Sequence, residues 1–531
     1  MRRKPAAPVF KAYVMHQDQL LPPSYDEVIE AGHLVRVVNE AIEKLDLSAI
    51  QGQYKGGGTS SYHPRMLLKV LVYAYSKKIY SSRKIAAAVR ENIHFMWLSG
   101  GNQPDFRTIN DFRGSRMKGV IDKVFAEVLE YLIETGHVKL ENYFVDGTKI
   151  EADANQHKVV WKKRKETYQK RVREKIDELL EQIEQVNEAE QAEYGEKDLE
   201  ERGGNGTGEI NSEKLKARIA ELNQKLREQA LSEEGTKEQR QALKELSEDC
   251  LPRLEKYEQQ TETLAGRTSY SQTDPDASSM RMKEDRGEEK PWPKPAYNVQ
   301  LGTEKQFIVG FTVHGQAGDT NCLTAHLDQT QHNLGGRFPK NIVADAAYGS
   351  EENYAYLVKH SVENYLKYNT FYQDTHHYRD PEVLRAHQFH ADHFGYDPAT
   401  DQFICPADKR LHFQSTSSDT TRNGYVIDHR TYQCLDCADC PLKGQCTKAE
   451  GNRQIHISFK LREFRQQARE NLTSEQGKKL RTARATDVET VFGHLKHNMG
   501  FRRFHLRGLA KVKTEWGLVS IAHNLRKMAD I

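Results

Sequence analysis

Residues 142–152 read NYFVDGTKIEA, and residues 340–353 read KNIVADAAYGSEEN. In each stretch a short, β-prone apolar run, Asn142–Val145 or Asn341–Ala344, is followed by an aspartate and a small-residue break. The pattern predicts that Asp146 and Asp345 stand at the C-terminal ends of two strands. Because ligands of open α/β sheets gather at such ends, we expect the two carboxylates to lie side by side.

A third acid, Glu489, lies in RATDVETVFGHLKHN, which has helical spacing and places Lys496 on the same face, about 10 Å along the axis. Two Asp and one Glu suit hard divalent cations, and two such ions roughly 3.5–4 Å apart serve in-line displacement at a phosphodiester. The plain alternatives are an Asp-Gly turn and a solvated helical Glu. The neighbouring acids Asp274, Asp276 and Asp319 are expected to be turn and cap residues, with Asp319 the first substitute if one of the three is wrong.

At these residues the chain resembles bacterial insertion-sequence transposases of the DDE, RNase H-like class. The segments DGTKIEA, ADAAYGSEEN and DVETVFGHLKHNMGFRRFHLRG resemble the first Asp, second Asp and Glu blocks of that class. The segments YHPRMLLKVLVYAY, SSRKIAAAVREN and FRTINDFR are similar to the helical domain that opens InsH-type transposases. The chain departs at Thr482, where many relatives carry Tyr, and Arg484 lies one place further from Glu489 than in the Tyr-Arg-Glu-Lys signature.

The resemblance implies a role for each matching residue. Asp146, Asp345 and Glu489 would be catalytic and would hold two Mg²⁺ or Mn²⁺ ions. The residues implied to contact DNA are Arg484, Lys496, Arg502, Arg503 and Arg507.

The fold class predicted is mixed α/β, with an RNase H-like core and three additional parts. Strands are expected at 142–145, 297–301, 307–313, 341–344 and 364–367. The expected parts are a helical DNA-binding domain (1–135), the catalytic core (138–156, 269–372 and 459–531), a helical, coiled-coil-like insertion (157–268) and a small Cys-rich, zinc-binding insertion (373–458). An ordinary helix bundle remains the alternative for the first part. The helical insertion has two alternative roles: it is a solvated protrusion, or it serves dimerisation or DNA gripping.

The Cys-rich insertion carries Cys405, Cys437, Cys440 and Cys446, which suit tetrahedral thiolate coordination of a structural Zn²⁺. The resemblance points to these four and leaves Cys434 spare. An iron–sulfur cluster, suggested by Cys434-x2-Cys437-x2-Cys440, and metal-free thiols stay open as alternatives.

The net charge of +2 says little about partners, so the distribution of charge along the chain is the informative quantity. Between Lys496 and Lys527 there are eight Lys or Arg and one acid, Glu515, which predicts a basic surface for DNA, with a solvated basic helix as the alternative. No apolar run approaches a membrane span of about 20 residues, and no signal peptide is evident. The cysteines, an odd number of seven with five of them clustered, argue against a secreted disulfide framework. We therefore expect a soluble, cytoplasmic, nucleoid-associated bacterial protein.

The function predicted is that of a transposase acting on double-stranded DNA, and the resemblance implies a homodimer or a larger assembly. It would bind the terminal inverted repeats of its element, cut there and join the freed ends to target DNA. The alternatives are an architectural DNA-binding protein without catalysis and a stand-alone Mg²⁺-dependent nuclease.

Overall fold

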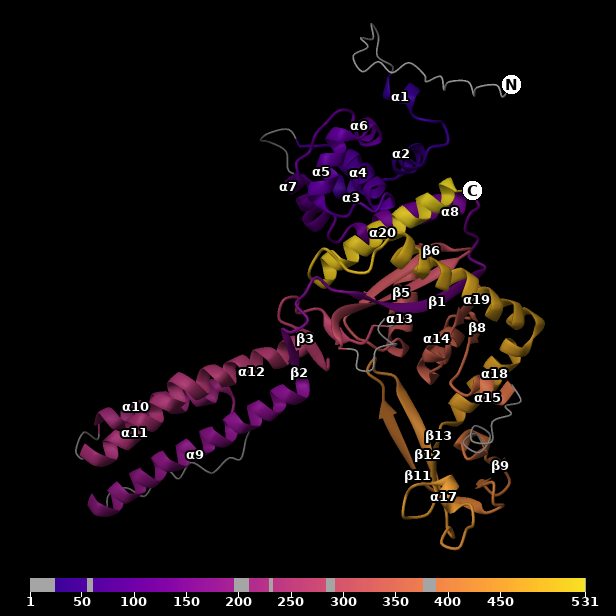
Figure 1. Cartoon of the computed structure of the whole chain (residues 1–531). Helices are drawn as coiled ribbons and strands as arrows, with labels where there is room; N and C mark the ends of the chain where they lie inside the picture. The colour runs from indigo at the N-terminus through magenta and orange to yellow at the C-terminus, as the bar shows by residue number, and fades with distance from the viewer. Residues whose placement is uncertain are drawn as a thin grey trace, which may run out of the picture.

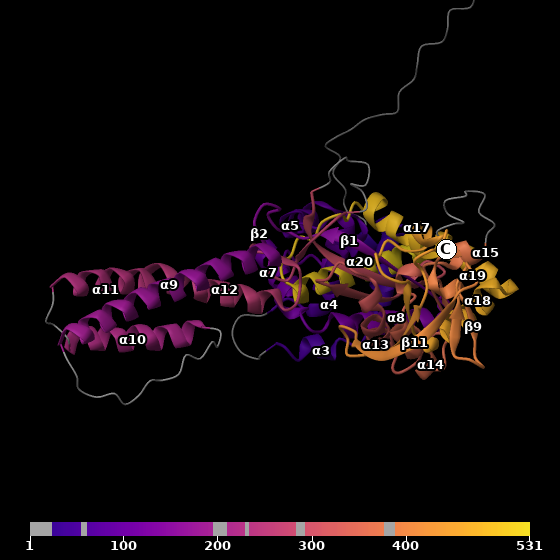
Figure 2. The same cartoon turned by 90° about the horizontal axis from the view of Figure 1, so that it is seen from below.

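The computed structural model describes residues 24–54, 61–194, 210–228, 233–282, 292–375 and 388–530. In Figure 1 the N-terminal helices lie over a central mixed sheet, a long helical arm projects to one side, and a smaller sheet lies at the end away from the N-terminal helices. Figure 2 shows the same arm extending sideways when the molecule is seen from below. Within these ranges no helix is both long enough and apolar enough to cross a membrane.

The N-terminal helices pack around α4 (Pro64–Ser76), which is buried along nearly its whole length, as its apolar sequence predicted. Proline at the first helical position and a capping His63 ring begin this helix. It packs against α2 and against the C-terminal helix α20 (Leu509–Ala529). The other helices of this part are α1 (Tyr25–Val28), α2 (Leu34–Lys44), α3 (Ser48–Gln51), α5 (Ser82–Glu91), α6 (Ile93–Ser99), α7 (Phe106–Asp111) and α8 (Ile121–Glu134).

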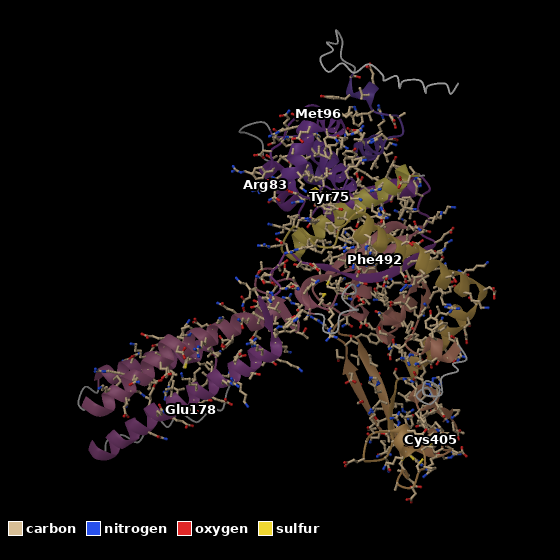
Figure 3. All side chains as sticks on the ribbon, in the orientation of Figure 1. Tyr75, Arg83, Met96, Glu178, Cys405 and Phe492 are labelled. Carbon is tan, nitrogen blue, oxygen red and sulfur yellow. The ribbon has the colours of Figure 1, made fainter. Side chains whose placement is uncertain are left out.

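The basic side chains of these helices divide into two groups. Arg65 donates to the carbonyl oxygens of Glu43 and Leu45, and Arg113 is buried with a 3.0 Å bond to the Tyr75 hydroxyl, so both serve the packing of the helices. The exposed side chains include Arg83 (labelled in Figure 3), Lys84, Arg90 and Arg107. Among the described residues named here, the exposed ones are open to DNA.

The central sheet has the order β4-β5-β1-β7-β8, and β6 pairs with β5. Strand β1 is antiparallel to β5 and parallel to β7, and β7 is parallel to β8. All five strands that the sequence predicted are in this sheet. Their bounds are β1 (Asn142–Glu151), β5 (Lys294–Glu304), β6 (Phe307–His314), β7 (Asn341–Ala344) and β8 (Glu363–Leu366), and the short β4 (Ser278–Met280) pairs with the start of β5.

Strand β1 corrects one detail of the sequence prediction, because it does not end at Asp146. It continues through Gly147 to Glu151, and the whole of this extension pairs with β5. The Asp-Gly pair therefore forms no turn here, since the ladder with β5 supplies hydrogen bonds that a turn would forfeit. Only the pairing with β7 ends at Val145, opposite Ala344.

Helices cover both faces of the sheet. On one face Tyr143 bonds to His326 and Thr330 of α13 (Leu323–Asn333). On the other face lie α19 (Glu475–Gly493) and α20; Asn524 of α20 bonds to both backbone groups of Ile308. Helix α14 (Glu351–Lys359) follows β7, and α18 (Phe459–Thr473) leads into α19.

The helical arm is inserted between two short paired strands, β2 (Val159–Trp161) and β3 (Ser269–Ser271). It has its own apolar core, which includes Ile176, Leu246 and Leu254. Its helices are α9 (Lys162–Tyr194), α10 (Ser212–Glu228), α11 (Glu233–Glu245) and α12 (Leu251–Leu264). The sequence also predicts a break in the helical pattern at Gly203, Gly204, Gly206 and Gly208, and these residues lie outside the described ranges.

The Cys-rich part contains a five-stranded antiparallel sheet that the sequence did not predict. Its order is β13-β12-β11-β10-β9. The bounds are β9 (Gly395–Asp397), β10 (Gln402–Ile404), β11 (Arg410–Thr420), β12 (Val426–Cys434) and β13 (Gln454–Ile457). Beyond its small apolar core the long β11–β12 hairpin reaches back to the part that contains the central sheet, where Tyr425 donates to Glu351 of α14.

Candidate active site

Two of the three predicted acids lie at the end of the parallel β1–β7 ladder. Val145 is paired with Ala344, so Asp146 and Asp345 are the next residues on two neighbouring strands. The Asp146 side chain is 10% exposed, whereas that of Asp345 is 38% exposed and also caps the turn Ala346–Tyr348 by accepting from the Ala347 N–H. The parallel register therefore brings the two carboxylates to one edge of the sheet.

The third acid arrives from α19, and a single guanidinium joins all three. Arg484, also on α19, lies 2.8 Å from Glu489 Oε1, 3.5 Å from Asp345 Oδ2 and 4.0 Å from Asp146 Oδ1. Residues from three parts of the sequence thus converge within reach of one side chain.

Arg484 is itself buried, with 8% of its side chain exposed. Burial alone would lower the pKa of this guanidinium, but Asp146, Asp345 and Glu489 together raise it above its ordinary value. The arginine is therefore firmly charged, and it compensates a cluster of carboxylates that would otherwise repel one another.

The donor set fits a hard divalent cation, since it consists only of carboxylate oxygens gathered around a positive charge. The positions of the side chains, however, are not those of a formed metal site. Within the part of the chain that the structure describes, no group of three or more His, Cys, Asp or Glu side chains is arranged so that it could hold a metal ion as it stands. Metal binding would require the carboxylates to close around the ion as Arg484 withdraws.

The opposite face of β1 supports the acids from behind. Gly147 leaves room there: a Cβ would lie 2.6 Å from Asp319 Oδ1 and closer still to Gln300. Asp319 accepts from Asn298 (2.7 Å) and Gln300 (2.9 Å) and pairs with Lys149 at 3.4 Å. Asp319 is thus engaged on the face away from Glu489, which argues against it as a substitute for one of the three acids.

Tyr348, three residues after Asp345, was missed by the sequence reasoning. Its buried hydroxyl donates to Gln300 Oε1, the residue that also bonds Asp319. Burial, followed by the charges of Asp319, Asp146 and Asp345, raises the pKa of this phenol well above its ordinary value. The sequence did offer one indication of this residue, because an aromatic side chain is unusual in the short small-residue break that follows the strand.

Comparison with known families decides the identity. Residues 404–529, which include Glu489, match the family described as Transposase DDE domain, and residues 23–115 match the Transposase domain (DUF772). The chain is a DDE transposase. No curated protein and no solved structure matches it. The DDE domain is that of a polynucleotidyl transferase acting in DNA transposition, and it implies an RNase H-like core, divalent metal ions and DNA as the partner.

The match does not extend to Asp146 and Asp345, which lie outside both matched segments. Their place in the transposase site therefore depends on the convergence with Glu489 described above.

The predicted DNA contacts lie in different surroundings. Lys496 is buried in a π-helical segment, His494–Asn498, that ends α19. Arg502 donates to the backbone oxygen of Lys496 and to the His497 ring. Arg503 and Arg507 are about half exposed, and both form ion pairs with Asp153, at 3.0 and 2.9 Å. The three arginines reach the surface, Arg484 lies among the three acids, and Lys496 is buried.

The basic surface predicted between Lys496 and Lys527 is only partly present. Most of α20 is buried between the N-terminal helices and the sheet, with Trp516 completely enclosed. Its cations serve that packing: Lys513 pairs with Asp122 of α8 at 2.6 Å, and Lys527 bonds to Gln306. The prediction was wrong for Lys513 and Lys527 because charge was counted along the sequence, while most of this helix is buried; Lys511 remains exposed.

The cysteines of the transposase do converge. Cys405, Cys434, Cys437, Cys440 and Cys446 line one cavity of about 20 Å³ at the end of the small sheet, where Figure 3 labels Cys405. The Arg453 N–H donates to Cys437 Sγ at 3.5 Å, and Cys434 Sγ donates to the Asp436 carbonyl. Burial raises the pKa of Cys434 to about 11. A cavity of this size accommodates one water or one small ion.

Proposed function

We propose that the transposase binds the terminal inverted repeats of its own insertion sequence, cuts the DNA there and joins the freed 3′ ends to target DNA. The proposal depends on one observation: carboxylates from β1, from the end of β7 and from α19 meet around a single buried arginine. Such a set suits phosphodiester chemistry, in which negative charge accumulates at the attacking and leaving oxygens. Because its substrate is DNA, we expect it to act in the cytoplasm at the nucleoid.

Asp146, Asp345 and Glu489 would hold two Mg²⁺ or Mn²⁺ ions. When bound, such ions compensate charge at the scissile phosphate and lower the pKa of a coordinated water or hydroxyl. The protein's own contribution is positioning. The β1–β7 register fixes the two aspartates, and α19 supplies Glu489, whose side chain is 53% exposed and able to turn toward an ion.

Arg484 would change partner when the ions bind. Its guanidinium, displaced from the carboxylates, would bind a phosphate oxygen near the scissile bond. Lys496 would assist from the end of α19, and Arg502, Arg503 and Arg507 would follow the DNA backbone outside the site.

For the Cys-rich part we propose a structural Zn²⁺ held by Cys405, Cys437, Cys440 and Cys446. Four thiolates close a tetrahedral shell and leave no open position, so the ion would stabilise the small sheet without taking part in the reaction. The shared cavity brings these four thiols and Cys434 together, and the N–H donated to Cys437 suits a thiolate at that position. Elemental analysis of protein purified without oxygen tests it: iron with inorganic sulfide would overturn the zinc assignment in favour of a cluster.

We also propose that the active form is a homodimer or a larger assembly, because joining requires two transposon ends at once. Mass measurement of the protein with and without end DNA tests this. A complex that contains one chain and still joins two ends would overturn it.

The catalytic assignment is tested by Asp345→Asn and Glu489→Gln. Both variants should retain affinity for end DNA and lose Mg²⁺-dependent strand cleavage. Glu475→Gln is the matched control, since Glu475 lies on the same helix, pairs only with Lys478 among the ion pairs described and is 84% exposed. Full cleavage by either acid variant would refute the assignment.

One incubation separates this function from its two rivals. Linear end DNA is mixed with the transposase, Mg²⁺ and a supercoiled plasmid, and the products are resolved by size. Cleavage with joining supports the proposal, cleavage alone indicates a nuclease, and binding without new products indicates an architectural protein.

A further inference from the structure

The start of the helical arm is an exposed basic surface that the catalytic site does not use. We define the arm root as Trp161–Arg171, the end of β2 and the first turns of α9. Between Lys162 and Lys175 the sequence has eight Lys or Arg and two Glu, whereas Ile176–Tyr194 has seven acids and no base. Figure 3 labels Glu178 at the beginning of the acidic half.

The placement of these cations opposes helix stability. Lys162, Lys163, Arg164 and Lys165 occupy the first turn of α9, which contains no acid. The N-terminal end of a helix dipole is positive and favours acidic side chains, so four cations in the first turn are repelled by the dipole and destabilise the helix. Among the four, Lys165 is buried and bonds to Gln169 and to Thr261 of α12. The other three are exposed, and a local rule broken in this way points to a function outside the helix.

Several of the exposed cations have no acid beside them. Lys162 and Lys170 form loose pairs with Glu166 and Glu174, at 3.9 and 3.6 Å. In the part of the arm that the structure describes, no ion pair joins Lys163, Arg164 or Arg171 to an acid. Their charges are therefore available to an anionic partner.

Two aromatic rings flank these cations. Trp161 and Tyr168 are 39% and 38% exposed. Arg164 lies 5.6 Å from the centre of the Tyr168 ring, and its Nε donates to the hydroxyl at 3.2 Å. The contact holds the exposed arginine side chain against the ring on the helix surface.

The arm root follows closely, along the chain, the segment that contacts two exposed arginines of the core. Asp153, which pairs with Arg503 and Arg507, lies between the end of β1 and β2. The backbone bridge between Glu151 and Arg503 fixes the two segments against each other. Since β1 rises about 3.4 Å per residue, its end at Glu151 is about 17 Å from Asp146, and the arm root begins beyond it.

We infer that the arm root binds the phosphate backbone of the duplex DNA on which the transposase acts, at a distance from the cut. From Lys163 to Arg171 the helix rises about 12 Å, over which a duplex presents about seven phosphates, so several can be contacted at once. The inference rests on the proposed function only in taking double-stranded DNA as the ligand.

Other anionic partners fit less well. A lipid surface would need an exposed apolar helix face, but the apolar face of α9, with Ile176 and Leu179, is buried in the arm. The acidic half of the arm in a second copy of this chain would be a weaker partner, because its negative charge is partly neutralised: Glu184 pairs with Arg218 of α10 at 2.9 Å. Double-stranded DNA is the partner that the exposed charges favour.

The test is the salt dependence of binding to a duplex of unrelated sequence, in EDTA so that no cleavage intervenes. The variant is Lys163→Gln/Arg164→Gln/Arg171→Gln in the full chain. Each lost phosphate contact lowers the slope of log Kobs against log salt by about 0.9, so the slope should fall by about 2–3 and low-salt affinity by about tenfold or more. Lys237→Gln/Arg240→Gln/Lys244→Gln removes the same charge from exposed positions on α11 and should leave both unchanged.

A charge-conserving variant, Arg164→Lys/Arg171→Lys, keeps the measurement interpretable if the first variant folds poorly, and it should retain the slope. An unchanged slope in the first variant, or an equal fall in the α11 control, would overturn the inference. So would loss of self-association with normal DNA binding, which would make the surface a protein contact. Because no cleavage is measured, these outcomes are independent of the test of the three acids.

Discussion

Replacing Arg484 by methionine tests how the three acids are held together. The Arg484 and Asp146 side chains are 8% and 10% exposed, and removal of one partner from a buried ion pair costs about 3–5 kcal/mol. The bond to the half-exposed Glu489 adds less than about 1 kcal/mol. We therefore expect the free energy of unfolding of the metal-free protein to fall by about 3–5 kcal/mol, because two carboxylates are left facing each other without a counter-charge.

Magnesium should reverse much of this loss, since cations bound by the acids take over the role of the guanidinium. The measurement is thermal melting of Arg484→Met and of the unaltered protein, each in EDTA and in saturating Mg²⁺. The variant should melt several degrees lower in EDTA and gain more from Mg²⁺ than the unaltered protein does.

Arg481→Met is the matched control on the same helix. The Arg481 guanidinium lies 5.0 Å from the centre of the Phe371 ring and, among the described ion pairs, has no carboxylate. Its variant should show no extra stabilisation by Mg²⁺. An Mg²⁺ effect in Arg484→Met equal to that of the unaltered protein would refute the view that the arginine occupies the place of a cation.

Three further predictions concern other parts of the molecule. Gly147→Ala should lower the rate of strand cleavage about 100-fold with little loss of DNA affinity, because the new Cβ would lie 2.6 Å from Asp319 Oδ1 and shift Asp146. Gly114→Ala is the control, since its new Cβ would meet nothing within 4 Å. Equal cleavage rates in the two variants would contradict this explanation. Burial lowers the pKa of His523 to about 4, so the stability it contributes is complete above about pH 6.5 and falls by about 3 kcal/mol as the pH drops toward 4. His523→Gln should flatten the pH dependence of the free energy of unfolding between about pH 6.5 and 4, as measured by urea denaturation. An unchanged pH dependence would count against His523 as its source. Finally, Cys440→Ser should lose bound zinc while Cys434→Ser retains it, as measured by atomic emission; loss in both would make Cys434 a ligand.

Much of the central sheet was predictable because its strands are short apolar runs with clear boundaries. Asn341–Ala344 and its aspartate behaved as the pattern indicated. Strand β1 was underestimated, since Asp-Gly favours a turn locally and only the distant strand β5 keeps it extended. The small antiparallel sheet was missed because β11 is exposed along Gln414–Thr420 and its run of Ser and Thr has no apolar alternation.

The candidate site was predictable in its acids but not in the cation that joins them. Arg484 departs by one place from the signature of related transposases, so its spacing gave no hint of a contact with Asp146 and Asp345. That contact depends on how α19 crosses the sheet, which is a property of the tertiary packing. In the same way, the pairing of Lys513 with Asp122 and of Lys527 with Gln306 could not be predicted from the charges alone.

The burial of α20 has a consequence for the order of assembly during synthesis. Tyr75 of α4 and Glu515 of α20 are neighbours, 3.4 Å apart, although 440 positions separate them. The ribosome therefore releases the first helices long before their partner exists, and they must wait, with part of their apolar surface uncovered, for translation to reach the last helix. A nascent chain interrupted before Leu509 would leave the N-terminal helices without the helix on which they dock.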